Sequence, residues 1–154
     1  MATASEAKRQ RMTQERVLVG ALELADRIGV ADLTIRRLAE ALDSKPMTIY
    51  HHVPSKDAIL DGIVDLVFAE IELPDPELDW KAAVRARCVS ARAVLARHPW
   101  AVPLMEARRS PGPATLRHHD AVVACLRRGL SLPMTAHAYA VLDAFVYGFA
   151  IQEA

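Results

Sequence analysis

The sequence is poor in aromatic residues and has only two cysteines, and these scarcities limit the class of protein that it can encode. Phe, Trp and Tyr make up 5% of its 154 residues, and the apolar residues are mostly Ala, Leu and Val, which suit packed helices better than pleated sheets. Cys88 and Cys125 each lie in an apolar, helix-patterned segment, which is more typical of buried reduced thiols than of a disulfide. We therefore expect an all-α protein.

Long apolar runs are also missing from the chain. No stretch of about 18 uncharged apolar residues occurs, and the polar start MATASEAKRQRMTQER is unlike a secretion signal. The 19 Lys and Arg residues equal the 19 Asp and Glu residues, so net charge neither supports nor excludes a nucleic acid partner. We expect a soluble, cytoplasmic protein with no membrane partner.

The sequence motifs of common enzymes are absent as well. There is no G-x-S-x-G, no glycine-rich phosphate loop, no H-E-x-x-H and no C-x-x-C. His118 and His119 are adjacent, and neighbours on a helix point about 100° apart, so they cannot share one metal-binding face. We expect neither an enzyme nor a metal or cofactor site.

The first half of the chain predicts four helices that are long, short, short and long. Apolar residues recur there every three or four positions, and each predicted start carries either a hydroxyl side chain that can accept first-turn N–H groups or a proline. The predicted ranges are 13–28, 34–42, 46–53 and 55–73. In the fourth helix the inward positions are Ile59, Ile63, Leu66 or Val67, and Ile71.

The third predicted helix carries more polar tips than a core helix would. Only Ile49 and Val53, four residues apart, face inward there. Two short helices joined by a tight turn, the second with polar tips outward, form a helix-turn-helix, whose second helix enters the major groove of DNA. The outward or lateral residues of the third helix are Pro46, Met47, Thr48, Tyr50, His51 and His52.

The residue types in this segment fit contacts with DNA. Arg36 can pair with guanine or phosphate, and Thr48 can hydrogen-bond a base or touch a thymine methyl group. Tyr50, His52 and Lys56 can reach phosphate oxygens. The alternative is a helical adaptor that binds a protein through TIYHHV; salt-dependent DNA binding would distinguish the two, because only phosphate contacts release counterions.

The stretch GALELADRIGVADLTIRRLAEALDSKPMTIYHHVPSKDAIL resembles the DNA-binding domain of the tetracycline-repressor (TetR) family of bacterial transcription regulators. In that family a helix ending in Gly precedes L-T-x-R-x-L-A-x-x-L, a turn, x-T-L-Y-x-H-V and a lysine. This chain has LTIRRLAEAL, MTIYHHV and SK in the same order and spacing. The segments ARHPWAVPLMEARRSPGP and AYAVLDAFVYGFAIQE are similar to the ligand-binding domain of the tetracycline-repressor branch.

The resemblance implies a repressor that a small-molecule effector releases from a palindromic, double-stranded operator. It implies a DNA-binding domain over residues 1–56 and an effector-binding and dimerisation domain over residues 57–154, in a family whose members often continue further. In the turn between the short helices, Asp43 stands where the family often has Gly. The implied DNA-contacting positions, with the neighbouring His51 added, are Arg36, Pro46, Met47, Thr48, Tyr50, His51, His52 and Lys56.

The effector domain should hold its pocket among the helices after Pro76. Glu72 and Met105 stand where tetracycline repressors have histidines for the drug and its magnesium, which argues against tetracycline as the effector. Tryptophans also pack in cores and interfaces, so composition alone does not assign the lining. The candidate lining residues by size are Trp80, Trp100, Met105, Phe145 and Phe149.

The last segment, SLPMTAHAYAVLDAFVYGFAIQEA, is apolar nearly all round. A helix of this kind is normally buried, and the domain expected here is too small to cover it. The sequence therefore predicts a two-fold symmetric homodimer with this helix at its centre.

Overall fold

The computed structural model describes residues 11–107 and 110–153, which form eight α-helices and no strand. The all-α prediction is confirmed. The helices are α1 (Gln14–Ile28), α2 (Ile35–Ala41), α3 (Pro46–His52), α4 (Lys56–Glu70), α5 (Trp80–Arg97), α6 (Ala101–Ala107), α7 (Pro113–Arg127) and α8 (Leu132–Glu153).

The predicted helix starts in the first half are confirmed by their caps. The hydroxyl groups of Thr13, Thr34 and Ser55 accept hydrogen bonds from the backbone N–H three residues later, at 3.1, 3.2 and 3.1 Å. α1 ends at Gly29, whose φ of 81° is a backbone conformation that glycine adopts without strain. Asp43, between α2 and α3, also has a positive φ of 49°, which explains why glycine suits that turn.

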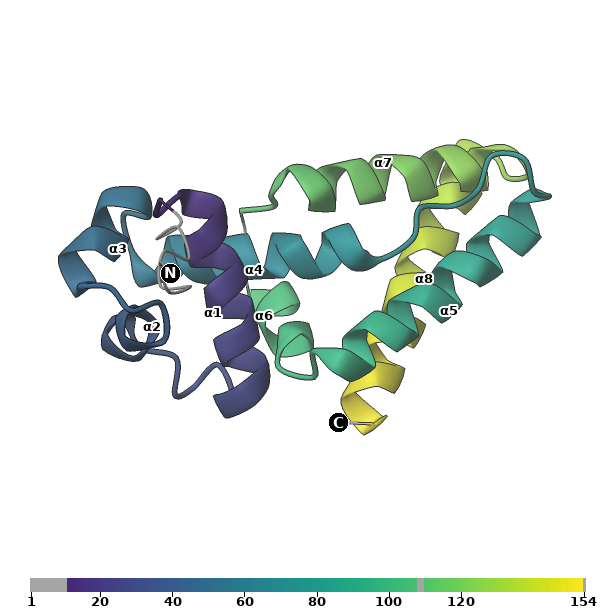
Figure 1. Ribbon diagram of the computed structural model, residues 1–154. Coiled ribbons are helices and arrows are strands. Elements are labelled where there is room, and N and C mark those ends of the chain that lie inside the picture. The colour runs from purple at the N-terminus through teal and green to yellow at the C-terminus, as the bar shows by residue number, and fades with distance from the viewer. Residues whose placement is uncertain (1–10, 108–109, 154) are drawn as a thin grey trace, which may run out of the picture.

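The helices α1, α2 and α3 gather at one end of the molecule, and α4 leads from them into the second half (Figure 1). One apolar core joins these helices to the first half of α4. It continues past residue 56, the predicted end of the DNA-binding domain. Its buried members are Val17, Ala21, Leu24, Ala25, Leu33, Leu38, Ala39, Ile49, Val53, Ile59, Leu60 and Ile63.

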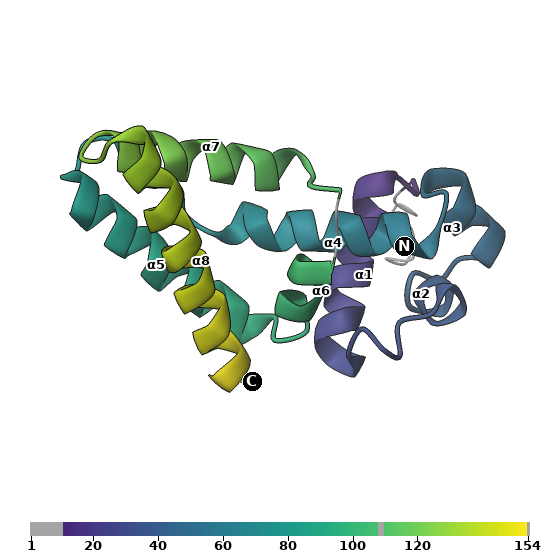
Figure 2. The same ribbon diagram turned by 180° about the vertical axis from the view of Figure 1, so that it is seen from behind.

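The second half is built around α4, α7, α5 and α8. α7 lies alongside α4, and α5 and α8 cross each other at the end away from α3, as both views show (Figures 1 and 2). Two further apolar clusters hold these helices, one centred on Val67, Val94 and Leu95 and the other on Val84 and Leu126. The predicted inward register of α4 is confirmed, with Val67 rather than Leu66 buried.

A small polar junction joins the DNA-binding end to the second half. The indole N–H of Trp100 donates to Asp26 Oδ1 at 2.7 Å, and His98 Nδ1 lies 2.7 Å from the same oxygen. His98 Nε2 lies 3.2 Å from Glu70 Oε2, which also accepts from Arg97. α1, α4 and the end of α5 are thereby fixed to one another.

α8 leaves much of its apolar surface uncovered. Among its residues only Thr135, Val146 and Ala150 are buried. It is the one helix of the described residues that is long and apolar enough to cross a membrane, which by length and composition alone is weak evidence of a span. Its exposed large apolar residues are Leu132, Met134, Val141, Phe145, Phe149 and Ile151.

Candidate DNA-binding face and effector cavity

The helix α3 is anchored by its apolar side and exposes the opposite side. Ile49 and Val53 are 0% and 1% exposed, as the sequence predicts, and α3 packs on α1 and α2 through this side. Met47 and Tyr50 are 67% and 45% exposed although both carry large apolar groups. A partner outside the described chain would gain the most from covering these two side chains.

The predicted DNA-binding positions differ in exposure. On α3, Met47, Tyr50 and His51 follow the three- and four-residue spacing that places them on one helix face. A helix with that face outward is the element that the major groove, about 12 Å wide, admits. The fully exposed positions of the predicted set are Arg36, Pro46, Met47, Tyr50, His51 and Lys56, while Thr48 and His52 are half-buried.

Cationic side chains lie on both sides of α3 in the chain. Lys45 immediately precedes α3 and Lys56 begins α4, and both are exposed. Arg36, on α2, donates to Glu40 at 3.1 Å, but the side chains are 86% and 63% exposed. Because an exposed ion pair contributes little, a phosphate or a base can replace Glu40 at small cost.

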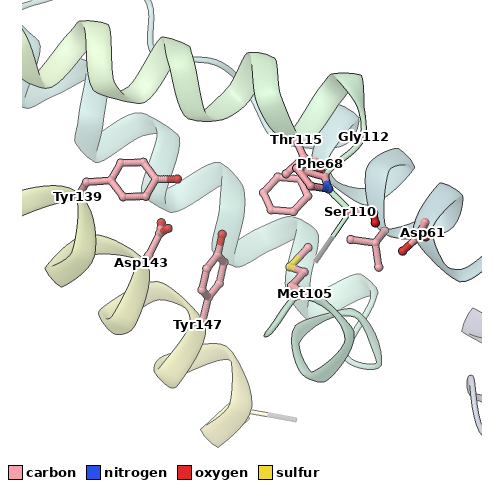
Figure 3. A pocket seen from close by; sticks show the side chains of 11 residues that line it. Asp61, Phe68, Met105, Ser110, Gly112, Thr115, Tyr139, Asp143 and Tyr147 are labelled. Carbon is pink, nitrogen blue, oxygen red and sulfur yellow. The ribbon is translucent and has the colours of Figure 1, made fainter. Parts of the chain in front are cut away.

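A cavity of about 350 Å³ lies in the second half, between α4, α6, α7 and α8 (Figure 3). Its volume is at the lower end of the range for small-molecule sites, roughly 300–1,000 Å³. The α4 wall is mostly apolar, and the α8 wall carries a carboxyl and two phenol groups. The lining residues are Asp61, Val64, Phe68, Met105, Ser110, Pro111, Gly112, Thr115, Tyr139, Asp143 and Tyr147.

The rim of the cavity is fixed where α7 begins. The carboxylate of Asp65, on α4, accepts hydrogen bonds from the backbone N–H groups of Ala114 and Thr115 at 3.1 and 2.8 Å, and from the Thr115 hydroxyl at 2.8 Å. These are the orphan donors of a helix N-terminus. A Cβ atom at Gly112 would collide with this carboxylate, so glycine is required there for α4 and α7 to approach.

The polar wall of the cavity is a stripe on α8. Tyr139, Asp143 and Tyr147 are four residues apart, so they share one face, and all three side chains point towards the cavity (Figure 3). Burial raises the pKa of the Asp143 carboxyl, against the opposing effect of Arg87. Burial and the Asp143 carboxyl raise the pKa of Tyr147 to about 12 and that of Tyr139 further, so both phenols stay protonated and can donate.

Two buried basic side chains contact this stripe from the interior. Arg87, on α5, is 1% exposed, and its Nη2 lies 3.8 Å from Asp143 Oδ1. Its Nε donates to Nε2 of His118, on α7, at 2.7 Å. Burial, together with the Arg87 charge, lowers the pKa of His118 to about 4, so the imidazole is neutral near pH 7.

The structure brings one of the five predicted pocket residues to this cavity. Met105 lines it, whereas Trp100 packs against both neighbouring cores and bonds to Asp26. Trp80 packs in the cluster of α5, α7 and α8, against the turn at Gly129. Phe145 and Phe149 lie on exposed α8 surface, 70% and 38% exposed.

The lining residues that size alone missed carried a periodic signal. Tyr139, Asp143 and Tyr147 place three polar side chains at a four-residue interval on an otherwise apolar helix. Of the two positions that differ from tetracycline repressors, Met105 lines the cavity and Glu72 is exposed outside it. No three His, Cys, Asp or Glu side chains are grouped to hold a metal ion among residues 11–107 and 110–153.

Comparison with known protein families assigns both halves of the chain. The family description "Bacterial regulatory proteins, tetR family" matches residues 17–63, and "Tetracyclin repressor-like, C-terminal domain" matches residues 73–154. The chain therefore belongs to the TetR family, and its N-terminal end is a helix-turn-helix domain.

Individual relatives agree with this assignment. The chain is 38% identical, over 75% of its length and 49% of the relative's, to an HTH-type transcriptional regulator of Saccharopolyspora erythraea. It is 32% identical, over 90% of its length and 53% of the relative's, to the HTH-type transcriptional repressor DrrR1 of Streptomyces coeruleorubidus. The chain thus spans about half the length of these curated relatives.

A solved structure supports the fold of both halves. The TetR family protein ActR of Streptomyces coelicolor, in complex with actinorhodin, superposes with a TM-score of 0.84 at 31% identity. The match covers 93% of this chain and 69% of that one.

Proposed function

We propose that this protein is a cytoplasmic transcriptional repressor that binds a palindromic operator as a homodimer and leaves it when a small molecule fills the cavity. Its relatives are named transcriptional regulators and a repressor, which supports regulation rather than catalysis. The cavity role is supported by a structural neighbour that holds a small molecule.

One observation carries the proposal, which is that α4 belongs to both sites. Lys56, at its first turn, stands next to α3, while Val64 and Phe68, two to three turns later, line the cavity. A rigid helix transmits a tilt at one end to the other, so a ligand that displaces the middle of α4 also moves the DNA-binding end. In a dimer this movement changes the spacing of the two α3 helices, which must be about one turn of DNA apart.

The binding face is tested by selecting operators from random double-stranded DNA and measuring their affinity as salt increases. We expect a palindromic consensus and an affinity that falls steeply with salt, because contacts with phosphate release counterions. Selection of no sequence, with salt-independent weak binding, would favour the helical adaptor instead.

The coupling is tested without knowing the effector by filling the cavity with a side chain. Val64→Phe should lower operator affinity in the absence of any ligand, since overpacking energies of about 1–3 kcal/mol correspond to roughly 5- to 150-fold. Leu116→Phe is the matched control, because Leu116 is exposed on α7 and does not line the cavity. Equal operator affinities in the two variants would refute the coupling.

A further inference from the structure

Arg87 is a charged side chain whose hydrogen-bonding capacity is largely unused. Guanidinium carries five N–H donors, has no acceptor and stays charged in proteins. Only Nε makes a hydrogen bond in the described structure, to His118. Nη1 and Nη2 are buried without a hydrogen-bond partner, and the 3.8 Å between Nη2 and Asp143 is too long for one.

His118 adds another unused donor. Its Nε2 must accept, because the Arg87 Nε–H opposite it can only donate. The neutral imidazole therefore carries its proton on Nδ1, which is also buried without a hydrogen-bond partner in the described structure. The unmatched buried atoms around Arg87 are thus all donors, and what would match them is an oxygen acceptor, preferably a charged one.

The cavity gives access to this donor cluster beside Asp143. Asp143 lines the cavity with Tyr139 and Tyr147 on either side, and it also faces Arg87. Phe68, which lines the cavity from α4, has its ring centre 5.9 Å from that of His118. The remaining wall, from Val64, Phe68, Met105 and Pro111, offers apolar surface to a flat molecule (Figure 3).

We propose that the cavity binds a small aromatic molecule bearing an acidic oxygen group, a carboxylate or an ionised phenol or enol, which enters the ion pair of Arg87 and Asp143. This inference rests on the proposed effector role of the cavity. The phenols of Tyr139 and Tyr147 donate to the same group or to a neighbouring oxygen of the ligand.

Two acidic groups cannot both stay ionised beside one guanidinium, so binding is coupled to a proton. Burial already raises the pKa of Asp143, so this carboxyl takes up the proton when the anion arrives. The titratable and charged groups facing it come from several helices: Arg87 on α5, His118 and His119 on α7, Tyr139 and Tyr147 on α8, and, across the cavity, Asp61 on α4.

The test is titration calorimetry of the 154-residue chain with matched sets of fused-ring aromatic probes. Each set contains a carboxylate, its neutral primary amide and the corresponding aminomethyl cation, 1-naphthoate being the smallest carboxylate. We expect at least one carboxylate to bind about tenfold or more tightly than its amide, since hydrogen bonds to charged groups contribute about 1.5–3 kcal/mol. Buffers of different ionisation enthalpy should reveal proton uptake.

Three variants assign the binding to this place. Arg87→Met should weaken the carboxylate about tenfold or more and leave the amide nearly unchanged. Asp143→Asn should strengthen the carboxylate and abolish proton uptake, a gain that misfolding cannot imitate. Arg92→Met is the matched control on α5, because Arg92 is exposed and lies over the ring of Phe149, away from the cavity.

Each other outcome contradicts the inference. It is overturned if no carboxylate binds better than its amide, if the cation binds best and Asp143→Asn removes that binding, or if Arg92→Met has the effect expected of Arg87→Met. Operator affinity is measured in parallel by fluorescence anisotropy. Carboxylate binding that depends on Arg87 but leaves operator affinity unchanged would uphold the ligand class and refute release from DNA.

Discussion

The two ends of the molecule differ in what their interiors contain. Around α1, α2 and α3 the buried residues of the core are all apolar. The polar or charged buried residues of the described chain, Arg87, His98, His118 and Thr135, all lie in the second half. A purely apolar core fixes one shape, whereas buried polar groups with unmatched donors gain free energy when a partner satisfies them. The first end is suited to present a rigid surface and the second to respond to a ligand.

The surfaces differ in the opposite sense. α3 presents polar and basic tips, while α8 presents Leu132, Val141, Phe145 and Ile151 to solvent. Polar tips suit a charged, hydrated partner such as DNA, and a row of exposed apolar side chains suits a protein surface. The predictions below break this comparison at one end or the other.

The largest effect is expected on the α8 surface. Phe145→Glu with Phe149→Glu should convert the predicted homodimer to monomers and weaken operator binding by roughly 100-fold or more, because the second half-site then contributes nothing. Sedimentation velocity and anisotropy with a full operator measure the two results. Leu116→Glu, on exposed α7, should change neither. Intact protein that sediments as a monomer at micromolar concentration with full operator affinity would refute the dimer.

The next effect is expected on stability in acid and concerns the interior of the second half. His118 stays neutral down to about pH 4 in the folded protein, whereas an unfolded histidine binds its proton near pH 6.5. The unfolded state therefore holds more protons between these values, so the free energy of unfolding falls with pH across this window, by as much as about 3 kcal/mol.

Denaturant unfolding of wild type and His118→Gln at several pH values isolates this contribution. Asp143, whose pKa burial raises, acts in the opposite direction, but it is present in both proteins and cancels in the difference. The variant should lose less stability than wild type as the pH falls. His137→Gln, at an exposed position on α8, should keep the wild-type slope. Parallel slopes for wild type and His118→Gln would contradict the assignment.

A smaller effect is expected at the DNA-binding end. Tyr50→Ala with Lys56→Ala should weaken binding to all DNA sequences alike, because both side chains are assigned to phosphates. It should also reduce the salt slope by about 2, one for each lost contact. Since both side chains are exposed, the free energy of unfolding should hardly change. An unchanged salt slope would contradict the phosphate assignment.

The helices were predictable from the sequence because their ends are set by local chemistry. Thr34 and Ser55 cap their helices through the hydrogen bonds that their side-chain types favour, and Pro113 begins α7 as expected of a residue without an N–H. Such contacts span only a few residues, so one chain segment contains all the information.

The cavity was predictable only in part, because its walls come from segments far apart in the chain. Residue size indicated Phe145 and Phe149, but size does not determine on which side of α8 a ring lies. Direction depends on where α5 and α7 pack, and the buried Arg87 fixes the polar side of α8 towards α5. Trp100 shows the same limit, since its partner Asp26 lies 74 residues away.

The smallest effect on overall affinity is expected from the positions assigned to bases. Arg36→Ala and Thr48→Ala should each relax the preference at particular base pairs by about 1–3 kcal/mol, and leave binding to unrelated DNA almost unchanged. Arg36 is paired with Glu40 in the free protein, so Glu40→Gln separates the two roles of the arginine. That variant should cost less than about 0.5 kcal/mol of stability, because the pair is exposed, and should retain the base preference. Binding-site selection with each variant measures the change. If Arg36→Ala instead weakens every sequence equally, Arg36 contacts phosphate, and the bases must be read by α3 alone.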